Sequence, residues 1–457
     1  MIVSFSVSNF RSFASEQTFS LVASNRFARD HENHTLPIPG SRERVLRSAV
    51  LYGANGAGKS NLFKAMRYMR IMARGSAKRK NGTRREVFRF GQGETTPSSF
   101  DLQFITNQKL YRFGFKVDDE RVLEEWLALV DGTKERTLYE RTTDTNGRVT
   151  IEAPGLKASG EKLKALATVA GPQNQTFLAT INLTLDEASR GEEINGILTW
   201  FKRGLTLISP DASYGNLGDL LSQNSNFKTF AGEFLKSSST GIDRLTVDRR
   251  EITEEELRGL LPSSVLGSVL KDIVEDDDGT AVVRLGEGNE FVIERKPQNR
   301  FFKVTIRSIH EHEPGKAIPL ELEEESDGTK RLLNLMPALH RIRNNSAIYF
   351  IDEIDRSLHP ILVRHFLEFF LKSCEGGQRQ IIVTTHESSL LDLDVLRRDE
   401  IWFAEKDPNA MTHLYSLSDF QVRKDLAIGK HYMQGRFGAI PFIGNFQELL
   451  AKQECPE

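Results

Sequence analysis

The feature that most constrains this chain is a glycine-rich turn placed between a strand and a helix. Residues 45–52, VLRSAVLY, are typical of a buried strand and lead directly into GANGAGKS (53–60), which fits the pattern G-x-x-x-x-G-K-[ST]. Apolar residues then recur at helical spacing, at Leu62, Ala65, Met66 and Met69. This order of elements predicts a βα core and favours a phosphate-binding loop over a plain glycine-rich turn.

The residue types in this loop fit the phosphate chain of a nucleotide. Glycines let backbone N–H groups close around phosphate oxygens at the positive end of the following helix. Lys59 is expected to supply charge to the β- and γ-phosphates, and the Ser60 hydroxyl to ligate Mg²⁺. We therefore predict ATP and Mg²⁺ as ligands, with the nucleotide held by Asn55, Gly56, Gly58, Lys59, Ser60 and Asn61.

A second motif, FIDEIDRSLHP (350–360), places two acids directly behind an apolar run. Buried carboxylates at a strand end are costly without a positive partner, and the phosphate-binding loop with its metal ion supplies one. Asp352 fits the strand-end acid that holds Mg²⁺. Glu353 is then left to orient or deprotonate the attacking water. The alternative, a solvent-facing strand end, is weakened by the presence of the loop.

Composition is that of an ordinary soluble protein. The 457 residues include 39% hydrophobic and 27% charged residues, and the net charge of −2 gives no global reason to bind nucleic acid or membranes. With only two cysteines, Cys374 and Cys455, there is no disulfide framework. The N-terminus lacks the features of a signal peptide, and no apolar run has the length of a membrane span. We expect a cytoplasmic location and no membrane contact.

Periodicity divides the chain into three expected segments: 1–184, an N-terminal lobe with the phosphate-binding loop; 185–315, a helical insertion that ends in β-hairpins; and 316–457, a C-terminal lobe that alternates strand and helix. The helix predicted to begin at Gly328 contains Pro337, which should kink or end it.

The order of motifs resembles the head of ABC-type ATPases. The two acids follow the lysine at a separation of 352 − 59 = 293 residues, Ser326 and Gly328 start a helix ahead of them, and His386 follows in IIVTTHES. The resemblance implies an α/β fold of two lobes, a mixed β-sheet and a P-loop core, interrupted by an insertion. In that family the signature serine and glycine grip the γ-phosphate bound to another subunit, and the histidine reaches the same phosphate. The resemblance therefore implies catalytic roles for Glu353 and His386. It also implies a homodimer or higher oligomer with ATP at the interface. Singly, Ser326 is more often an N-cap and His386 a strand-end histidine.

The first residues narrow this resemblance. SVSNFRSF (6–13) is similar to the opening of RecF- and SMC-like heads, where the corresponding arginine and serine lie near the nucleotide. Arg11 and Ser12 are assigned on that basis alone, the alternative being an exposed turn.

The closing motifs DEIDRSLHP, TTHESSLLD, RRDEIWFAEKD and YMQGRFGAIP resemble a bacterial group of abortive-infection and phage-defence ATPases, such as those of the PARIS systems, related to the overcoming-lysogenization-defect nucleases. The resemblance implies a slow ATPase that acts as a sensor or scaffold and controls a separately encoded effector, with contact to nucleic acid or a phage protein as a further option. The alternative is a RecF-like DNA-repair clamp. The chain departs from the ABC pattern at Asp327, Thr329 and His359, and Gln173 and Gln175 are the candidates for the Q-loop glutamine.

Two charged stretches remain. Residues 70–89 hold eight Lys or Arg against one acid, Glu86, and are either a solvated loop or a contact for nucleic acid or an acidic partner. Asp276–Asp278 is expected to be a solvated turn, and the chain is expected to carry no nuclease chemistry of its own.

Overall fold

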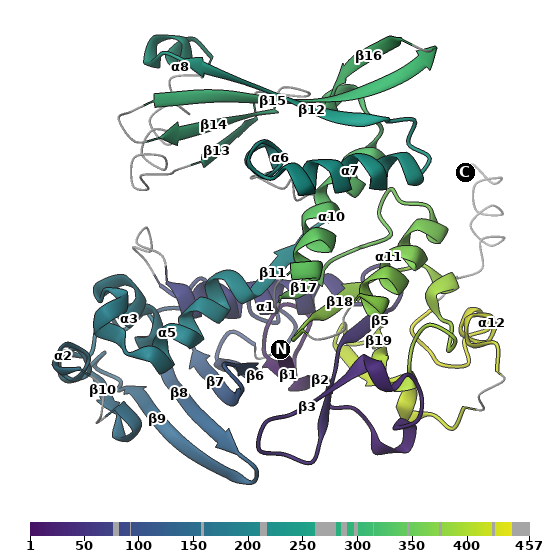
Figure 1. Ribbon diagram of the computed structural model, residues 1–457. Coiled ribbons are helices and arrows are strands. Elements are labelled where there is room, and N and C mark those ends of the chain that lie inside the picture. Colours follow the sequence, from purple (N-terminus) through teal and green to yellow (C-terminus); the bar gives the residue numbers. More distant parts are fainter. Residues whose placement is uncertain are drawn as a thin grey trace, which may run out of the picture. The chain divides into compact units, whose positions relative to one another are not determined.

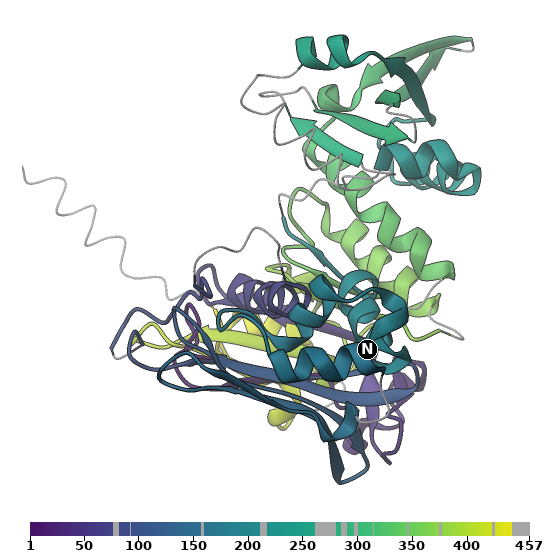
Figure 2. The same cartoon turned by 90° about the vertical axis from the view of Figure 1, so that its left-hand side faces the viewer.

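A computed structural model describes residues 1–75, 82–91, 93–156, 160–210, 217–260, 280–284, 290–296, 300–313, 315–344, 347–373, 377–422 and 426–440. The chain forms two compact units (Figures 1 and 2). The first comprises Met1–Pro210, Asn345–Asp355 and Phe366–Glu457, and the second comprises Asp211–Asn344 and Arg356–His365. These bounds differ from the predicted ones at 184 and 315.

The first unit contains an antiparallel sheet of seven strands in the order β10-β9-β8-β7-β6-β1-β2. Burial alternates along much of β1 and β6, because one face packs on the core while the other meets water. The strands are β1 (Ile2–Ser8), β2 (Gln17–Ser20), β6 (Ser98–Thr106), β7 (Lys109–Val117), β8 (Val122–Asp131), β9 (Lys134–Thr143) and β10 (Val149–Glu152). A turn that contains Asn146-Gly147 joins β9 to β10, with Gly147 at a φ of 80°.

A second sheet in this unit has the order β11-β17-β18-β5-β19-β20 and is parallel except at its β19–β20 edge. The strands are β5 (Ser48–Tyr52), β11 (Leu205–Ile208), β17 (Ile348–Ile351), β18 (Gln380–Thr384), β19 (Ile401–Lys406) and β20 (Thr412–Ser416). Strands β5, β17 and β18 are buried along their whole length, as central parallel strands are. Since these three strands are neighbours and parallel, their carboxyl ends meet at one edge of the sheet.

Helix α1 (Lys59–Arg74) joins these two sheets. Its Phe63 ring contacts Phe350 of β17, while the Tyr68 ring packs at a tilt against Phe100 and Phe115 of the antiparallel sheet. The other helices of the unit are α2 (Glu161–Val169), α3 (Phe177–Thr184), α4 (Glu187–Arg190), α5 (Glu192–Thr199), a π-helix (Trp200–Gly204) and α12 (Ile428–Met433); a short pair, β3 (Thr35–Pro37) and β4 (Arg44–Leu46), precedes β5. Helices α3 and α5 lie on the same face of the antiparallel sheet (Figures 1 and 2).

The second unit is built on a five-stranded antiparallel sheet in which β15 pairs with β12, β14 and β16. The strands are β12 (Arg244–Ile252), β13 (Thr280–Arg284), β14 (Glu290–Lys296), β15 (Arg300–Glu313) and β16 (Lys316–Glu321), and the helices are α6 (Leu217–Gln223), α7 (Ser225–Ser237), α8 (Glu254–Leu260) and α10 (Asp327–Asn344). Phe227 and Leu235 of α7 share a core with Leu332 and Met336 of α10. Helix α11 (Pro360–Lys372) begins in this unit and ends in the first.

Three expectations about elements need correction or comment. Helix α10 does not end at Pro337 but continues to Asn344, because burial of residues on either side of the proline, such as Met336 and Leu339, offsets one missing hydrogen bond. The segment expected to be an insertion from residue 185 onward supplies β11, a core strand, because its short apolar run LTLI pairs with β17. Asp276–Asp278, Cys374 and Cys455 lie outside the described residues.

The predicted mixed α/β fold is confirmed, with its glycine-rich loop between a parallel strand and a helix. In the described part of the chain, no helix is long and apolar enough to cross a membrane.

Candidate nucleotide-binding site

The glycine-rich loop leaves the end of β5 and closes against the start of α1. Gly56 and Gly58 have φ angles of 77° and 109°, which side chains other than glycine rarely adopt. At Gly58 a Cβ atom would also come within 2.2 Å of Thr412 Oγ1. Asn55 and Gly56 are exposed at the tip. The loop therefore has the open, backbone-lined form that phosphate binding requires.

The Lys59 side chain folds back over this loop. Its Nζ donates to the carbonyl oxygens of Gly53 at 2.7 Å and Ala54 at 3.1 Å, and lies 3.3 Å from His386 Nδ1. Burial lowers the pKa of the Lys59 ammonium to about 8, against the opposing effect of nearby carboxylates, of which Asp355 is the strongest. An anion bound at the loop would offset the free-energy cost of burying the Lys59 ammonium.

Ser60 and Asp352 meet across the site although they are far apart in the sequence. The Ser60 hydroxyl donates to Asp352 Oδ1 at 3.2 Å, and Asp352 is 2% exposed. A hydroxyl and a carboxylate oxygen in contact are two ligands of the type that Mg²⁺ takes beside phosphate oxygens and water. The donor set predicted for the metal thus fits Mg²⁺ in both chemistry and position.

Thr384, at the end of β18, holds the two acids in place. Its hydroxyl donates to Asp352 Oδ1 at 2.6 Å and accepts from the Glu353 N–H at 2.8 Å. Glu353 has a φ of 48°, a left-handed conformation that costs a non-glycine residue roughly 1–2 kcal/mol. The bond from the Glu353 N–H to Thr384 offsets part of that cost, and the Glu353 side chain is half-buried.

His386 follows the same strand and completes the group around Lys59. Its backbone N–H donates to Asp355 Oδ2 at 3.1 Å. Burial, and then the neighbouring Lys59 ammonium, lower the pKa of the His386 imidazole below its ordinary value. The other carboxylate oxygen, Asp355 Oδ1, is buried and has no hydrogen-bond partner among the residues that the structure describes. An acid without a sequence assignment is therefore part of this site.

The turn that contains Arg11 and Ser12 lies behind the glycine-rich loop. Ser12 Oγ accepts from Asn61 Nδ2 at 2.7 Å and lies 2.7 Å from Thr412 Oγ1, which also donates to the Ala57 carbonyl at 2.8 Å. Ser12 is thus brought to the loop, with its hydroxyl already bonded to protein. The Arg11 guanidinium instead pairs with Glu86, and the Arg11 N–H donates to the Glu86 carbonyl at 2.7 Å.

Ser326 and Gly328 lie in the second unit, at the start of α10. Ser326 Oγ accepts from the Thr329 N–H at 3.1 Å, so it caps the helix. A Cβ on Gly328 would come within 2.7 Å of the Ser357 carbonyl, which explains why a glycine stands there. The preceding Glu325 accepts from Ser308 Oγ at 2.5 Å and lies 2.8 Å from His310 Nε2, and these contacts fix the start of the helix to β15.

The family is shown by the match of a family model. The model described as "AAA domain, putative AbiEii toxin, Type IV TA system" matches residues 48–153 and 183–392, which include the glycine-rich loop, both acids and His386. The chain belongs to this family. It is a P-loop ATPase in its family, with the mixed α/β fold that its motifs predicted.

Other comparisons are distant. A search of curated proteins found no match. Among solved structures, the SMC head domain from Thermotoga maritima is 12% identical, with a TM-score of 0.36, over 92% of this chain and 99% of that one. An SMC head bound to the C-winged helix domain of ScpA is 14% identical, with a TM-score of 0.39, over 91% and 97%. A third, an SMC head with an extended coiled coil bound to the C-terminal domain of ScpA from Pyrococcus furiosus, is 13% identical, with a TM-score of 0.38, over 91% and 96%.

The remaining sequence candidates bond elsewhere among the described residues. Gln175 Nε2 donates to Thr180 Oγ1 at 3.0 Å, and the Gln173 side chain lies beside Gly147. His359 is exposed, and its Nδ1 accepts from the Ile361 N–H at 3.3 Å at the start of α11. Their assignment to the Q-loop and D-loop of the ABC pattern stays a prediction.

Sequence reasoning missed Thr384, Asp355 and Thr412. Thr384 and Asp355 stand within TTHES and DEID, so the motifs were recognised but these members of them were not assigned. Nothing in the sequence singles out Thr412, whose contact with the loop depends on the antiparallel edge strand β20.

Proposed function

We propose that this chain binds ATP with Mg²⁺ and hydrolyses it slowly. The observation that carries the proposal is the 3.2 Å contact between Ser60 Oγ and Asp352 Oδ1, beside the buried Lys59 ammonium. A hydroxyl, a carboxylate and a cation at the mouth of a backbone-lined loop are what a metal-bound triphosphate needs. The positions of the other side chains suggest their roles in nucleotide binding and hydrolysis.

The ground-state contacts belong to the loop. Its backbone N–H groups and the Lys59 ammonium bind the phosphates, for which Lys59 exchanges the carbonyls of Gly53 and Ala54 for phosphate oxygens. Ser60 and Asp352 hold the metal ion, which when bound neutralises the charge on the β- and γ-phosphates. Asn55 and Gly56 are exposed at the loop tip, where they can follow the phosphate chain.

The chemical step belongs to Glu353 and His386. The carboxylate of Glu353 lies next to the metal ligand Asp352, and we assign it as the base that takes a proton from the attacking water. His386, 3.3 Å from Lys59 Nζ, is placed to bind the same γ-phosphate that Lys59 binds. Asp355 positions His386 through its backbone N–H.

Two substitutions test these roles. Lys59→Ala should abolish ATP binding, because Lys59 supplies charge in the ground state. Glu353→Gln should bind ATP normally but retain it unhydrolysed, because Glu353 acts on water in the transition state. Binding is measured with a fluorescent ATP analogue and turnover by phosphate release. Wild-type turnover in Glu353→Gln contradicts the assignment of the base.

We further propose a homodimer, or a higher oligomer of such pairs, in which Ser326 and Gly328 of one copy complete the ATP site of another. Support comes from the family resemblance and from the helix start at α10, where an anion is favoured. An isologous pair holds two nucleotides. In a mixture of Lys59→Ala and Ser326→Arg subunits, each heterodimer keeps one intact composite site, so part of the ATPase activity should return. No recovery in the mixture contradicts assembly in trans.

At the level of the cell, we propose a cytoplasmic antiphage sensor or scaffold whose ATP state controls a separately encoded effector. Family membership supports this reading, since the family is described by a toxin–antitoxin system. The test is plating of phage on cells that express the chain with its neighbouring gene. Protection should require both genes and should be lost with Lys59→Ala. Protection by this chain alone contradicts a separately encoded effector, whereas replication genes as its neighbours favour the DNA-repair clamp instead.

A further inference from the structure

The outward face of α1 carries only positive charge. The helix sequence KSNLFKAMRYMRIMAR has five basic residues and no acidic one. Lys59 belongs to the nucleotide site. The other four recur every three or four residues, at Lys64, Arg67, Arg70 and Arg74, and therefore share one side of the helix. Lys64 and Arg67 are exposed and Arg70 and Arg74 are half-buried, whereas the residues between them are mostly core.

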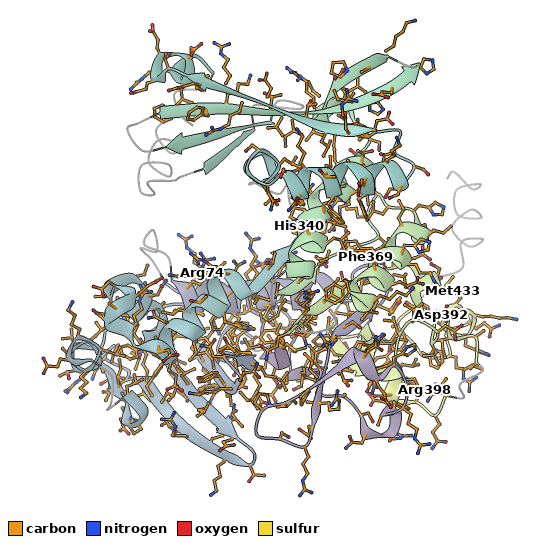
Figure 3. All side chains as sticks on the ribbon, viewed as in Figure 1. Arg74, His340, Phe369, Asp392, Arg398 and Met433 are labelled. Carbon is orange, nitrogen blue, oxygen red and sulfur yellow. The ribbon has the colours of Figure 1, made fainter. Side chains whose placement is uncertain are left out.

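A second element adds to this face. Arg70 Nε donates to the Phe201 carbonyl at 2.9 Å and its Nη2 to the Lys202 carbonyl at 3.2 Å. These bonds fix the π-helix Trp200–Gly204 beside α1. Lys202 and the exposed Arg203 of the π-helix therefore lie next to the basic face of α1. We call the resulting set the α1 basic surface: Lys64, Arg67, Arg70, Arg74, Lys202 and Arg203. Arg74, at its end, is labelled in Figure 3.

The charges of this surface are not balanced by neighbours. Within the described ranges, no side chain of the set forms an ion pair. Burial, followed by the charges of Arg74 and Arg67, lowers the pKa of Arg70 to about 10. Burial and the buried Arg190 likewise lower the pKa of Lys202, and among the described residues Glu187 opposes them. Mutual repulsion of this kind is relieved when an anion binds.

The basic stretch seen in the sequence is only partly the same surface. Arg85 is buried and donates to Asp119 and to backbone carbonyls, so it is structural. Lys78, Arg79 and Lys80 lie outside the described residues. Of residues 70–89, Arg70 and Arg74 contribute here, and the partners Lys202 and Arg203 come from a distant part of the chain.

We propose that the α1 basic surface binds the sugar–phosphate backbone of double-stranded nucleic acid without reading its sequence. The four helix cations span about 15 Å, a length over which one strand of a duplex presents about four phosphates. No aromatic side chain belongs to the set, so stacking of unpaired bases is not provided for. The exposed apolar side chain among the cations is Ile71, too little for the apolar centre of a protein interface. The inference goes beyond the proposed ATPase and does not rest on it.

The test is binding of a fluorescent DNA duplex to the full chain as a function of salt. With about six phosphate contacts, the plot of log K against log salt should have a slope of about −5. The triple substitution Arg67→Gln, Arg74→Gln, Arg203→Gln should weaken binding roughly 100-fold at low salt and make the slope shallower by about 3. A matched control replaces three exposed lysines elsewhere in the first unit, Lys134→Gln, Lys164→Gln and Lys406→Gln, and should bind like the wild type.

The other arms separate the possible partners. Single-stranded DNA of equal length and polyglutamate are titrated in parallel, and ATP turnover and the melting temperature are measured for each variant. Equal duplex binding by the triple variant and the control overturns the proposal. So does tighter binding of single-stranded DNA, which would indicate base stacking. Binding of polyglutamate as tight as that of the duplex, lost in the same triple variant, would assign the surface to an acidic protein instead.

Discussion

The hydroxyl of Thr384 donates a 2.6 Å hydrogen bond to the carboxylate of Asp352. Thr384 is the last residue of β18 and Asp352 directly follows the neighbouring parallel strand β17, so the bond links the two strand ends at the edge of the sheet that carries the candidate nucleotide site. The same oxygen accepts from the Glu353 N–H at 2.8 Å. One buried side chain thus orients the predicted metal ligand and the backbone of the predicted base.

Thr384→Val should therefore reduce ATP turnover by roughly 10- to 100-fold, the usual effect of losing a residue that orients a metal ligand. Valine keeps the volume but removes the hydroxyl that donates to Asp352 Oδ1 and accepts from the Glu353 N–H. Turnover and the Mg²⁺ concentration for half-maximal activity are measured together, and the latter should rise. Thr384→Ser keeps the hydroxyl and is the matched control. Equal Mg²⁺ dependence in the valine and serine variants would show that Thr384 does not orient the metal ligand.

The loop itself should depend on Thr412. Thr412→Val removes the donor to the Ala57 carbonyl and puts a methyl group 2.7 Å from Ser12 Oγ. A lost bond at a buried carbonyl costs about 1–3 kcal/mol, part of which falls on the loop conformation, so the dissociation constant for ATP should rise about 5- to 10-fold. Thr412→Ser should bind ATP nearly as the wild type does. A Thr412→Val protein that melts lower but binds ATP equally well would limit Thr412 to a role in folding.

The sequence predicted the centre of this site because the motifs sit at strand ends. Gly53–Ser60, Asp352 and His386 each follow a buried apolar run, and parallel strands bring their carboxyl ends together. Thr384 and Thr412 were not predictable in the same way, since a threonine acquires a role only from what faces it. The bounds of the compact units differ from the predicted segments for a related reason: β11 is four residues long and its pairing with β17 depends on distant sequence.

Binding of ATP should be accompanied by uptake of protons at His386. In the free site, burial and the Lys59 ammonium lower the pKa of the imidazole below its ordinary value. A bound phosphate brings negative charge close and raises that pKa again, so His386 binds up to about one proton per nucleotide between its two pKa values. Affinity for ATP should therefore increase as the pH falls below neutrality. Calorimetry in buffers of different ionisation enthalpy measures the uptake, and His386→Gln should remove its share. Uptake that is unchanged in His386→Gln would assign the proton to another group.

Gly328→Ala should destabilise the second unit and disturb the start of α10. The added Cβ would stand 2.7 Å from the Ser357 carbonyl, a backbone atom that moves only if the segment Arg356–His365 shifts. Overpacking of this kind costs about 1–3 kcal/mol. Gly232→Ala in α7 is the matched control: its Cβ meets its nearest neighbour, Arg244 Cα, at an ordinary 3.6 Å, and helix propensity favours alanine by about 1 kcal/mol. Chemical denaturation of both variants should thus give shifts of opposite sign in the free energy of unfolding.

If Ser326 and Gly328 act on the nucleotide of a second copy, Gly328→Ala should also lower ATP turnover while Gly232→Ala leaves it unchanged. Loss of stability in Gly328→Ala with full turnover would count against a role of the α10 start in hydrolysis.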